Sequence, residues 1–214
     1  MPDAVDFKKL AKELYLPKTT PALVDVPAMT FIMIDGQGDP NTAASFQTAM
    51  EILYGLSYSI KMSKMIGRTP AGYFDYVVPP LEGLWSVDGV ANFRGYKVAD
   101  KNTLRWTSMI RQPDFVTPAV FAEVQQSLGK KKPHLDTSLA RLEVFAEGLC
   151  AHVMHIGAYD DEAATIDRLE AFIAKAGYVT DISATRRHHE IYLSDPRKTP
   201  VEKLKTVIRH PIRK

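Results

Sequence analysis

The chain has 214 residues, of which 45% are hydrophobic and 24% are charged, as in a soluble domain or two small fused ones. The formal net charge is only +2, and its interspersed acidic and basic residues favour neither a nucleic-acid nor a membrane partner. No apolar run approaches the roughly 20 residues that cross a bilayer. A single cysteine, Cys150, excludes an intramolecular disulfide. Because the N-terminus also lacks a secretory signal, we expect a cytoplasmic protein, either a monomer or a weak homodimer.

The first half of the chain begins with a predicted strand at residues 28–36, an apolar run closed by glycines. A helix is predicted at residues 41–62, because apolar positions recur there every three or four residues and form one face. Two extended segments follow, YFDYVVPP and LEGLWSV, which are separated by Pro79 and Pro80. A further strand is predicted at residues 104–110.

A connecting helix is predicted from Thr117 to Gly129, because Thr117 resembles an N-cap and Pro118 a first-turn proline. The second half then has two strand-like runs, RLEVFAEG and LCAHVMHIG, and a helix at residues 160–176. The alternating segment HHEIYLS follows, and the last strand lies in EKLKTVIRHPI.

The two halves share one order of elements, which is a strand, a helix and then two extended segments. We therefore predict an α+β fold with a duplicated strand-helix-strand-strand (SHS2-type) repeat, antiparallel sheets and helices packed on one face. The first repeat covers residues 28–113, the connecting region 114–138 and the second repeat 139–212. An insertion near residues 86–102 makes the spacing unequal, so the duplication is based on element order. The groove between the repeats is the expected ligand site.

The segment HHEIYLS is the strongest candidate for a functional strand. Period-two alternation places His188, Glu190 and Tyr192 on one face and the intervening residues on the other. We expect the intervening, more apolar face to pack on the helices. The first face offers an imidazole, a carboxylate and a phenol in a row, which suits cation binding or proton transfer. The alternative is a polar face turned to solvent.

Aromatic residues of the first half could form the wall of a pocket. Trp85 and Trp106 are predicted on neighbouring strands, and Tyr58 is close in sequence to further aromatic residues. Stacked rings bind flat or cationic ligands, although aromatic residues on strands are commonly core residues. Glu82 is a second carboxylate among apolar neighbours. Its burial would favour a role as an acid or base, whereas exposure would make it an ordinary edge charge.

Metal and cofactor chemistry has little support in the sequence. His152 and His155 lie three apart on a predicted strand, so they point to opposite faces, and zinc-binding motifs are absent. We predict no metal and no cofactor. The turn GQGDP lacks the glycine pattern of a nucleotide-binding loop, and Cys150 is interpreted as a buried core residue.

Three segments together resemble the GyrI-like small-molecule-binding family: PPLEGLW, the run from Trp106 to Pro113, and HHEIYLSDPRKTPVEKLKTVIR. The resemblance covers nearly the whole chain after about Pro21. It implies a duplicated fold with a ligand groove between the repeats and a pocket carboxylate, which corresponds to Glu190. The chain lacks an obvious helix-turn-helix ahead of this region, unlike the family's transcription regulators.

The LEGLW segment is similar to stand-alone members that hydrolyse cyclopropane-bearing alkylators within an aromatic cage. This resemblance implies a planar aromatic or cationic xenobiotic ligand, with Glu190, Tyr192 and Glu82 as catalytic candidates. Trp85, Trp106, Tyr58 and His188 are the ligand-binding candidates. The alternatives are a non-catalytic sequestering or sensor module and a protein-interaction role like that of the gyrase-inhibiting members.

Overall fold

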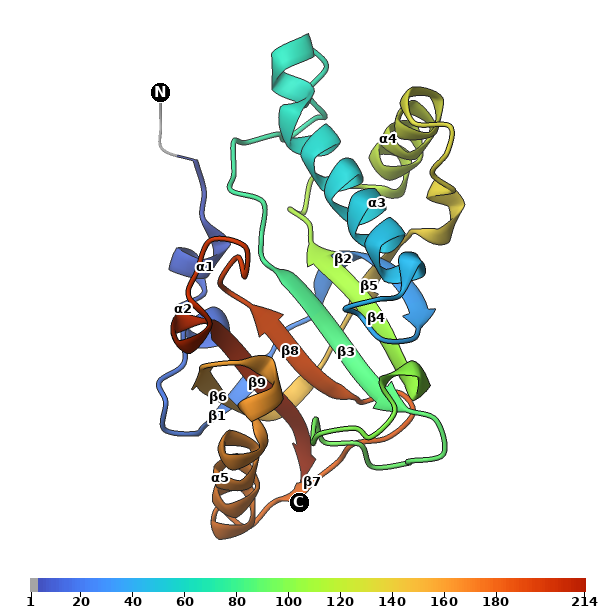
Figure 1. Cartoon of the computed structure of the whole chain (residues 1–214). Coiled ribbons are helices and arrows are strands. Elements are labelled where there is room, and N and C mark those ends of the chain that lie inside the picture. Colours follow the sequence, from blue (N-terminus) through green and yellow to red (C-terminus); the bar gives the residue numbers. More distant parts are fainter. Residues whose placement is uncertain (1–3) are drawn as a thin grey trace.

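The computed structural model describes residues 4–214, which form a mixed α+β structure (Figure 1). The strands of this part of the chain are β1 (Ala22–Val26), β2 (Met29–Gln37), β3 (Leu81–Val87), β4 (Leu104–Arg111), β5 (Arg141–Phe145), β6 (Gly148–Ile156), β7 (Val179–Thr180), β8 (His188–Tyr192) and β9 (Lys205–Arg213). The α-helices are α1 (Phe7–Leu10), α2 (Lys12–Tyr15), α3 (Ala44–Lys61), α4 (Pro118–Lys131) and α5 (Ala163–Lys175). The predicted α+β class is therefore confirmed.

One sheet runs through the whole molecule in the order β1-β6-β9-β8-β3-β4-β2-β5, with β7 paired to β9. All of these named strand pairs are antiparallel. In the first half β4 lies between β2 and β3, and in the second half β9 lies between β6 and β8. The two halves thus share a strand order as well as an element order, while their origin by duplication stays a prediction.

The two halves meet where β3 pairs with β8. Gly83 lies opposite Glu190 and Trp85 lies opposite His188 in this register. Because directly paired residues point to the same face of a sheet, the candidate residues of β8 share a face with Trp85. The pairing is regular through Gly83 on both sides of β3, so no bulge re-aims Glu82, which points to the opposite face.

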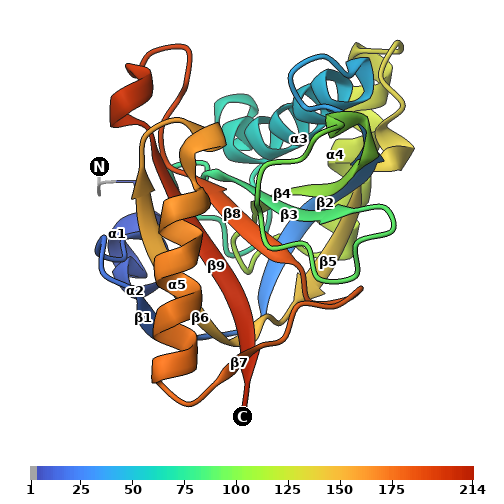
Figure 2. The ribbon, with the colours of Figure 1, turned by 60° about the horizontal axis from the view of Figure 1, so that its bottom comes forward.

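The three long helices cover one face of the sheet. Helices α3 and α4 pack on the first half, in a cluster that contains Ile34, Leu53 and Trp106, and α5 packs on the second half through Ile166 and Leu169. In Figure 1, α3 and α5 lie on either side of β3 and β8. Figure 2 shows that α5 lies in front of β9 and beside β8. No helix within residues 4–214 is both long enough and apolar enough to cross a membrane.

The opposite face of the sheet has its own core beneath the short helices α1 and α2. Leu14 and Tyr15 pack there against residues from both halves, including Met109 and Ile191. Both faces of the central strands are consequently buried, which explains why the run Phe31, Ile32, Met33 and Ile34 is apolar without alternation.

Three local predictions differ from the structure. The helix expected to begin at Asn41 begins at Ala44, because Asp39 accepts a hydrogen bond from the Asn41 amide and holds the preceding residues in a turn. The segment YFDYVVPP contributes only an isolated bridge at Tyr76, since its prolines cannot donate to a ladder. Asp160 and Asp161 form a 3-10 turn before α5.

The orientation of β8 also differs from the prediction. Ile191 belongs to the core on the α1 and α2 side of the sheet, whereas the face with Glu190 is turned toward the long helices. The alternation of β8 is regular, but its apolar side packs into the core beneath α1 and α2, on the opposite face from the long helices. Sequence alternation identifies two faces but does not say which face the helices cover.

Candidate functional site

A cavity of about 1350 Å³ lies between α3 and the start of α5, over β3 and β8. Residues of both halves line it, including Tyr54, Trp85, Glu162, Glu190 and Tyr192. Typical small-molecule pockets measure roughly 300–1,000 Å³. The cavity therefore has room for a large organic ligand.

One side of the cavity is an aromatic wall, which we define as Phe46, Tyr54, Tyr58 and Trp85. The rings of Phe46 and Trp85 are stacked with centroids 6.4 Å apart, and those of Tyr54 and Tyr58 are stacked at 6.3 Å. Tyr58 is 50% exposed and Trp85 only 6%, so the wall extends from the mouth to the floor. Offset rings at such distances suit contact with a flat ligand.

The floor of the cavity carries a hydrogen-bonded set of side chains centred on Glu190. Its Oε2 accepts a hydrogen bond from the Tyr192 hydroxyl at 2.7 Å, and that hydroxyl accepts one from Trp85 Nε1 at 2.9 Å. Its Oε1 lies 2.9 Å from His188 Nε2. Burial, together with the negative charge of Glu190, raises the pKa of Tyr192 well above its ordinary value. Tyr192 therefore stays a neutral donor that orients the carboxylate.

Gly83 makes this arrangement possible because it leaves space beside Glu190. A Cβ atom at this position would lie 2.7 Å from Trp85 Nε1 and 3.3 Å from the Tyr192 hydroxyl oxygen. The missing side chain thus allows the indole to lie across β3 and reach Tyr192.

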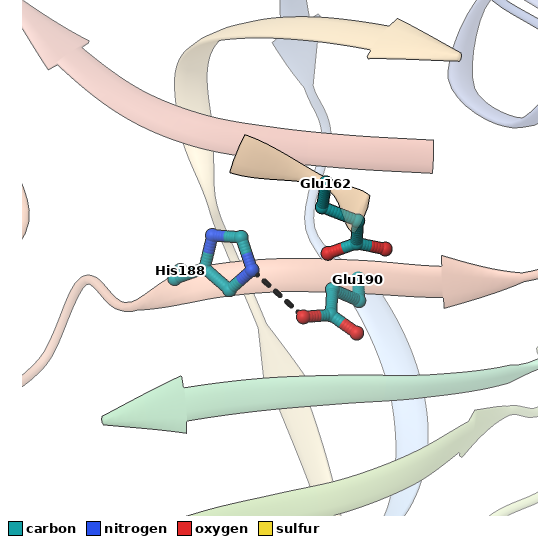
Figure 3. Close-up of side chains that lie close together, drawn as sticks. All are labelled: Glu162, His188 and Glu190. Carbon is teal, nitrogen blue, oxygen red and sulfur yellow. Dashed lines mark hydrogen bonds and ion pairs between the residues drawn. The ribbon is translucent and has the colours of Figure 1, made fainter. Parts of the chain in front are cut away.

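A second carboxyl group, that of Glu162, lies beside Glu190 (Figure 3). Glu162 is the N-cap residue of α5 and is 3% exposed. Its Oε1 has no hydrogen-bond partner within residues 4–214. Burial and the negative charge of Glu190 raise the pKa of Glu162 well above its ordinary value. The raised pKa favours the protonated form of Glu162 next to a second carboxyl group, an arrangement suited to acid and base roles.

Glu162, His188 and Glu190 place potential ligand atoms within 4.8 Å of one another, close enough to hold one metal ion. Both nitrogens of His188 and both oxygens of Glu190 already lie within hydrogen-bond distance of other side chains. Of these three residues, Glu162 alone offers an oxygen without a partner in the described part of the chain. We therefore interpret this group as a hydrogen-bonded acid-base cluster.

Three of the candidates from the sequence, Trp106, Glu82 and His188, do not line the cavity. Trp106 is 1% exposed and packs in the α3 core, where its ring meets Phe46 edge-on at 5.0 Å. It supports the aromatic wall from behind. Glu82 is also buried, which is one of the two alternatives that the sequence left open, but it lies on the opposite face of the sheet. The structure thus gathers Glu190, Tyr192, Trp85 and Tyr58 at the cavity and separates Trp106 and Glu82 from them. His188, predicted as a ligand-binding residue, is fully buried and contacts Glu190 from behind the cavity surface.

Glu82 belongs instead to a buried ionic network on the α1 and α2 side. It accepts a hydrogen bond from the Tyr15 hydroxyl at 3.2 Å, and its Oε2 lies 3.0 Å from His189 Nε2. His189 also pairs with Glu147, which accepts a hydrogen bond from Arg209 at 2.9 Å. Each member of this network is buried. Its position and pairing indicate a role in stability.

The segment between β3 and β4 spans from the first half to α5. Arg94 pairs with Glu170 at 3.0 Å, and Lys101 pairs with Asp160 at 2.9 Å. The ring of Phe93 meets the His188 ring edge-on at 5.9 Å. This segment, which the sequence marked only as an insertion, covers the buried end of the acid-base cluster.

Gly95 in this segment is expected to be sensitive to substitution. Its φ is +86°, and a Cβ atom would lie 2.3 Å from His188 Cε1. Gly89 offers a matched control, because it has a φ of +76° but no described atom lies within 4 Å of the place that its Cβ would take. Gly95→Ala should therefore lower the free energy of unfolding by about 1–3 kcal/mol more than Gly89→Ala, as measured by urea denaturation. Equal losses would contradict the close contact with His188.

Sequence reasoning missed Glu162, although a signal for it exists. Glu162 lies four residues before Ile166, so helical periodicity places it on the buried stripe of α5. His210 similarly alternates with Ile208 and Ile212 on β9 and therefore faces α5. In both cases a polar residue occupies a position that the apolar pattern of its helix or strand marks as buried.

Comparison with known proteins finds solved structures that are similar to the chain over almost its whole length. A protein from Listeria innocua whose crystal structure is described as that of an uncharacterised conserved protein is 45% identical, with a TM-score of 0.91, and the match covers 98% of this chain and 100% of that one. A second, described as a hydrolase from Listeria innocua, is 43% identical with a TM-score of 0.88 over 98% and 100%. Residues 123–213 match the GyrI-like small molecule binding domain. The chain belongs to the same family as these two Listeria proteins, and its second half contains a GyrI-like domain.

The GyrI-like match falls on the second half, which supplies Glu162, Glu190 and Tyr192 to the cavity. The C-terminal domain of EcmrR shares the fold at 14% identity, with a TM-score of 0.50 over 91% of this chain and 98% of that domain. No protein of curated function matched the chain. The family and the cavity together identify a small-molecule-binding domain.

Proposed function

We propose that this GyrI-like protein binds planar aromatic xenobiotics in the cavity and adds water to a cyclopropane conjugated with a carbonyl group. The observation that carries this proposal is the placement of Glu162 and Glu190 side by side at the end of an aromatic wall. The hydrolase description of the 43% identical Listeria protein supports the reaction class. The resemblance of the LEGLW segment supports the substrate class.

In this proposal the aromatic wall holds the flat part of the ligand and orients the cyclopropane toward the floor. Glu190 takes a proton from a water molecule as the water oxygen attacks a cyclopropane carbon. One carbon–carbon bond of the ring breaks, and its electron pair moves through the conjugated system to the carbonyl oxygen. Glu162 supplies the proton that this oxygen takes up. The product is the substrate plus one water molecule.

The structural setting changes the role proposed for Tyr192. The resemblance made the phenol a catalytic candidate, but its hydroxyl donates to Glu190 and accepts from Trp85. We therefore assign Tyr192 to orienting the Glu190 carboxylate. Glu162 is better placed to protonate the substrate, because its Oε1 has no hydrogen-bond partner among the described residues.

The two tryptophans provide a sharp test of ligand binding. A planar aromatic compound bound in the cavity should quench the fluorescence of Trp85. The quenching should therefore be largely lost in Trp85→Phe and retained in Trp106→Phe, because Trp106 lies behind the wall. Fluorescence titration measures both. Quenching that persists in Trp85→Phe would contradict binding against the aromatic wall, whereas saturable binding without product formation would leave a sequestering module.

A further inference from the structure

A continuous series of hydrogen-bonded side chains leads from the floor of the cavity to Glu170 on α5, whose side chain is partly exposed. His188 Nε2 lies 2.9 Å from Glu190 Oε1, and His188 Nδ1 lies 2.8 Å from His210 Nε2. His210 Nδ1 lies 2.7 Å from Glu170 Oε1. The four side chains come from β8, β9 and α5, and the sequence separates them by up to 40 residues. Only the fold aligns them.

Both imidazoles of this chain are fully buried, with 0% exposure. Phe93 and Gly95 cover the His188 ring. Glu170 is the opposite end, and its side chain is 18% exposed. The chain thus connects the carboxylate in the cavity with a carboxylate that solvent reaches, through two groups that solvent does not reach.

The number of protons in the chain follows from its three contacts. Each contact between two acceptor-capable atoms needs one proton, and two neutral imidazoles carry only one N–H each. The third proton must come from an imidazolium or from a protonated carboxyl group. The three contacts therefore require one proton more than two neutral imidazoles supply.

The surroundings of Glu170 set the direction in which the donors point. Arg94 and Thr180 both contact Glu170 Oε2, at 3.0 and 2.7 Å. Burial acts to raise the pKa of Glu170, but the hydrogen bonds from His210 and Thr180 and the charge of Arg94 lower it below the ordinary value. Burial lowers the pKa of His210 to about 4. An ionised Glu170 thus accepts the Nδ1 proton of a neutral His210.

The remaining protons are then assigned in order. A neutral His210 with its proton on Nδ1 has a bare Nε2, which must accept from His188 Nδ1–H. The additional proton lies between His188 Nε2 and Glu190. The hydrogen bonds from His188 to His210 and from His210 to Glu170 consequently both point toward Glu170.

We propose that His188, His210 and Glu170 form a proton relay that carries to the partly exposed carboxylate of Glu170 the proton taken from water at Glu190. This inference rests on the proposed function. When Glu190 gains a proton from water, His188 passes its Nδ1 proton to His210 Nε2. His210 passes its Nδ1 proton to Glu170, which releases one proton to solvent. One proton enters and one leaves. Both imidazoles must then return their N–H to Nδ1, with His188 Nε2 again sharing the proton of Glu190, before the next turnover. The proton lost by Glu162 to the product is regained separately.

The arrangement of protons is tested without any substrate by ¹⁵N NMR of histidine-labelled protein. We expect His210 to carry a proton on Nδ1 and none on Nε2, and His188 to carry a proton on Nδ1. A bare Nδ1 on His188, or a His210 protonated on Nε2 alone, would overturn the relay. This result does not depend on whether the chain hydrolyses any compound, so it is separable from the proposed function.

The transfer itself is tested with Glu170→Gln, which keeps an acceptor oxygen for His210 but cannot take up a proton. With a hydrolysed substrate, we expect kcat to fall by at least about tenfold while KM is unchanged. Asp167→Asn is the matched control, because it removes a carboxylate of α5 that holds the covering segment through Tyr96. An unchanged kcat in Glu170→Gln, or an equal fall in both variants, would overturn the relay.

Discussion

Replacing Arg209 with methionine is expected to lower the free energy of unfolding by about 3–5 kcal/mol, because it leaves buried carboxylates without their cation. Arg209 is 1% exposed, and its guanidinium donates to Glu147 at 2.9 Å and to the Leu14 carbonyl oxygen at 2.7 Å. Methionine keeps most of the apolar volume of the side chain. Urea denaturation followed by circular dichroism measures the loss.

Arg213 on the same strand is the matched control for this variant. Its side chain is 65% exposed and pairs with Asp181 at 3.2 Å. Arg213→Met should therefore change the free energy of unfolding by less than about 0.5 kcal/mol. Comparable losses in both variants would show that the buried ionic network contributes no more to the free energy of unfolding than an exposed ion pair does.

The same network gives the stability a defined dependence on pH. Burial acts to raise the pKa of Glu147, but His189 and Arg209 outweigh it and lower that pKa to about 2 from an ordinary 4.5. Its contribution is thus present above pH 4.5 and lost as the pH falls toward 2. Despite burial, Glu147 and Glu82 raise the pKa of His189, so its contribution is present below pH 6.5 and lost as the pH rises through the raised value.

Replacing Glu190 with glutamine is expected to reduce the rate of cyclopropane hydrolysis by roughly 10²–10⁴-fold, because an amide cannot accept the proton of water. Binding of a planar aromatic compound should persist, since the aromatic wall is unaltered. Single-turnover kinetics separate the two effects. Glu143→Gln, which alters an exposed carboxylate on β5, is the control and should keep the rate. Full activity in Glu190→Gln would remove Glu190 from the mechanism.

The fold was largely predictable because its elements obey simple periodicities. The apolar stripe of α5 and the alternation of β8 identified both elements and the residues that share a face. What alternation could not supply was the side of the sheet that the helices cover, because the curled sheet has cores on both faces. Glu82 illustrates the consequence: the sequence left its burial open, and the structure buries it in a network on the opposite face from the cavity.

The candidate site was predictable only where its residues lie on one strand. His188, Glu190 and Tyr192 alternate within five residues, so their common face follows from the sequence. Glu162 and Glu170 come from α5, and His210 from β9. Their approach to β8 depends on long-range packing that no local pattern encodes. Trp106 was placed wrongly for a different reason. It is paired with Trp85 and shares its face of the sheet, but only Trp85 lines the cavity.

The most direct test of a water-adding site at Glu190 and Glu162 is incubation with a carbonyl-conjugated cyclopropane compound in H₂¹⁸O, followed by mass spectrometry. We predict a ring-opened product that contains one ¹⁸O atom and forms in proportion to the amount of protein. Product formation no faster than in a protein-free sample would contradict the account.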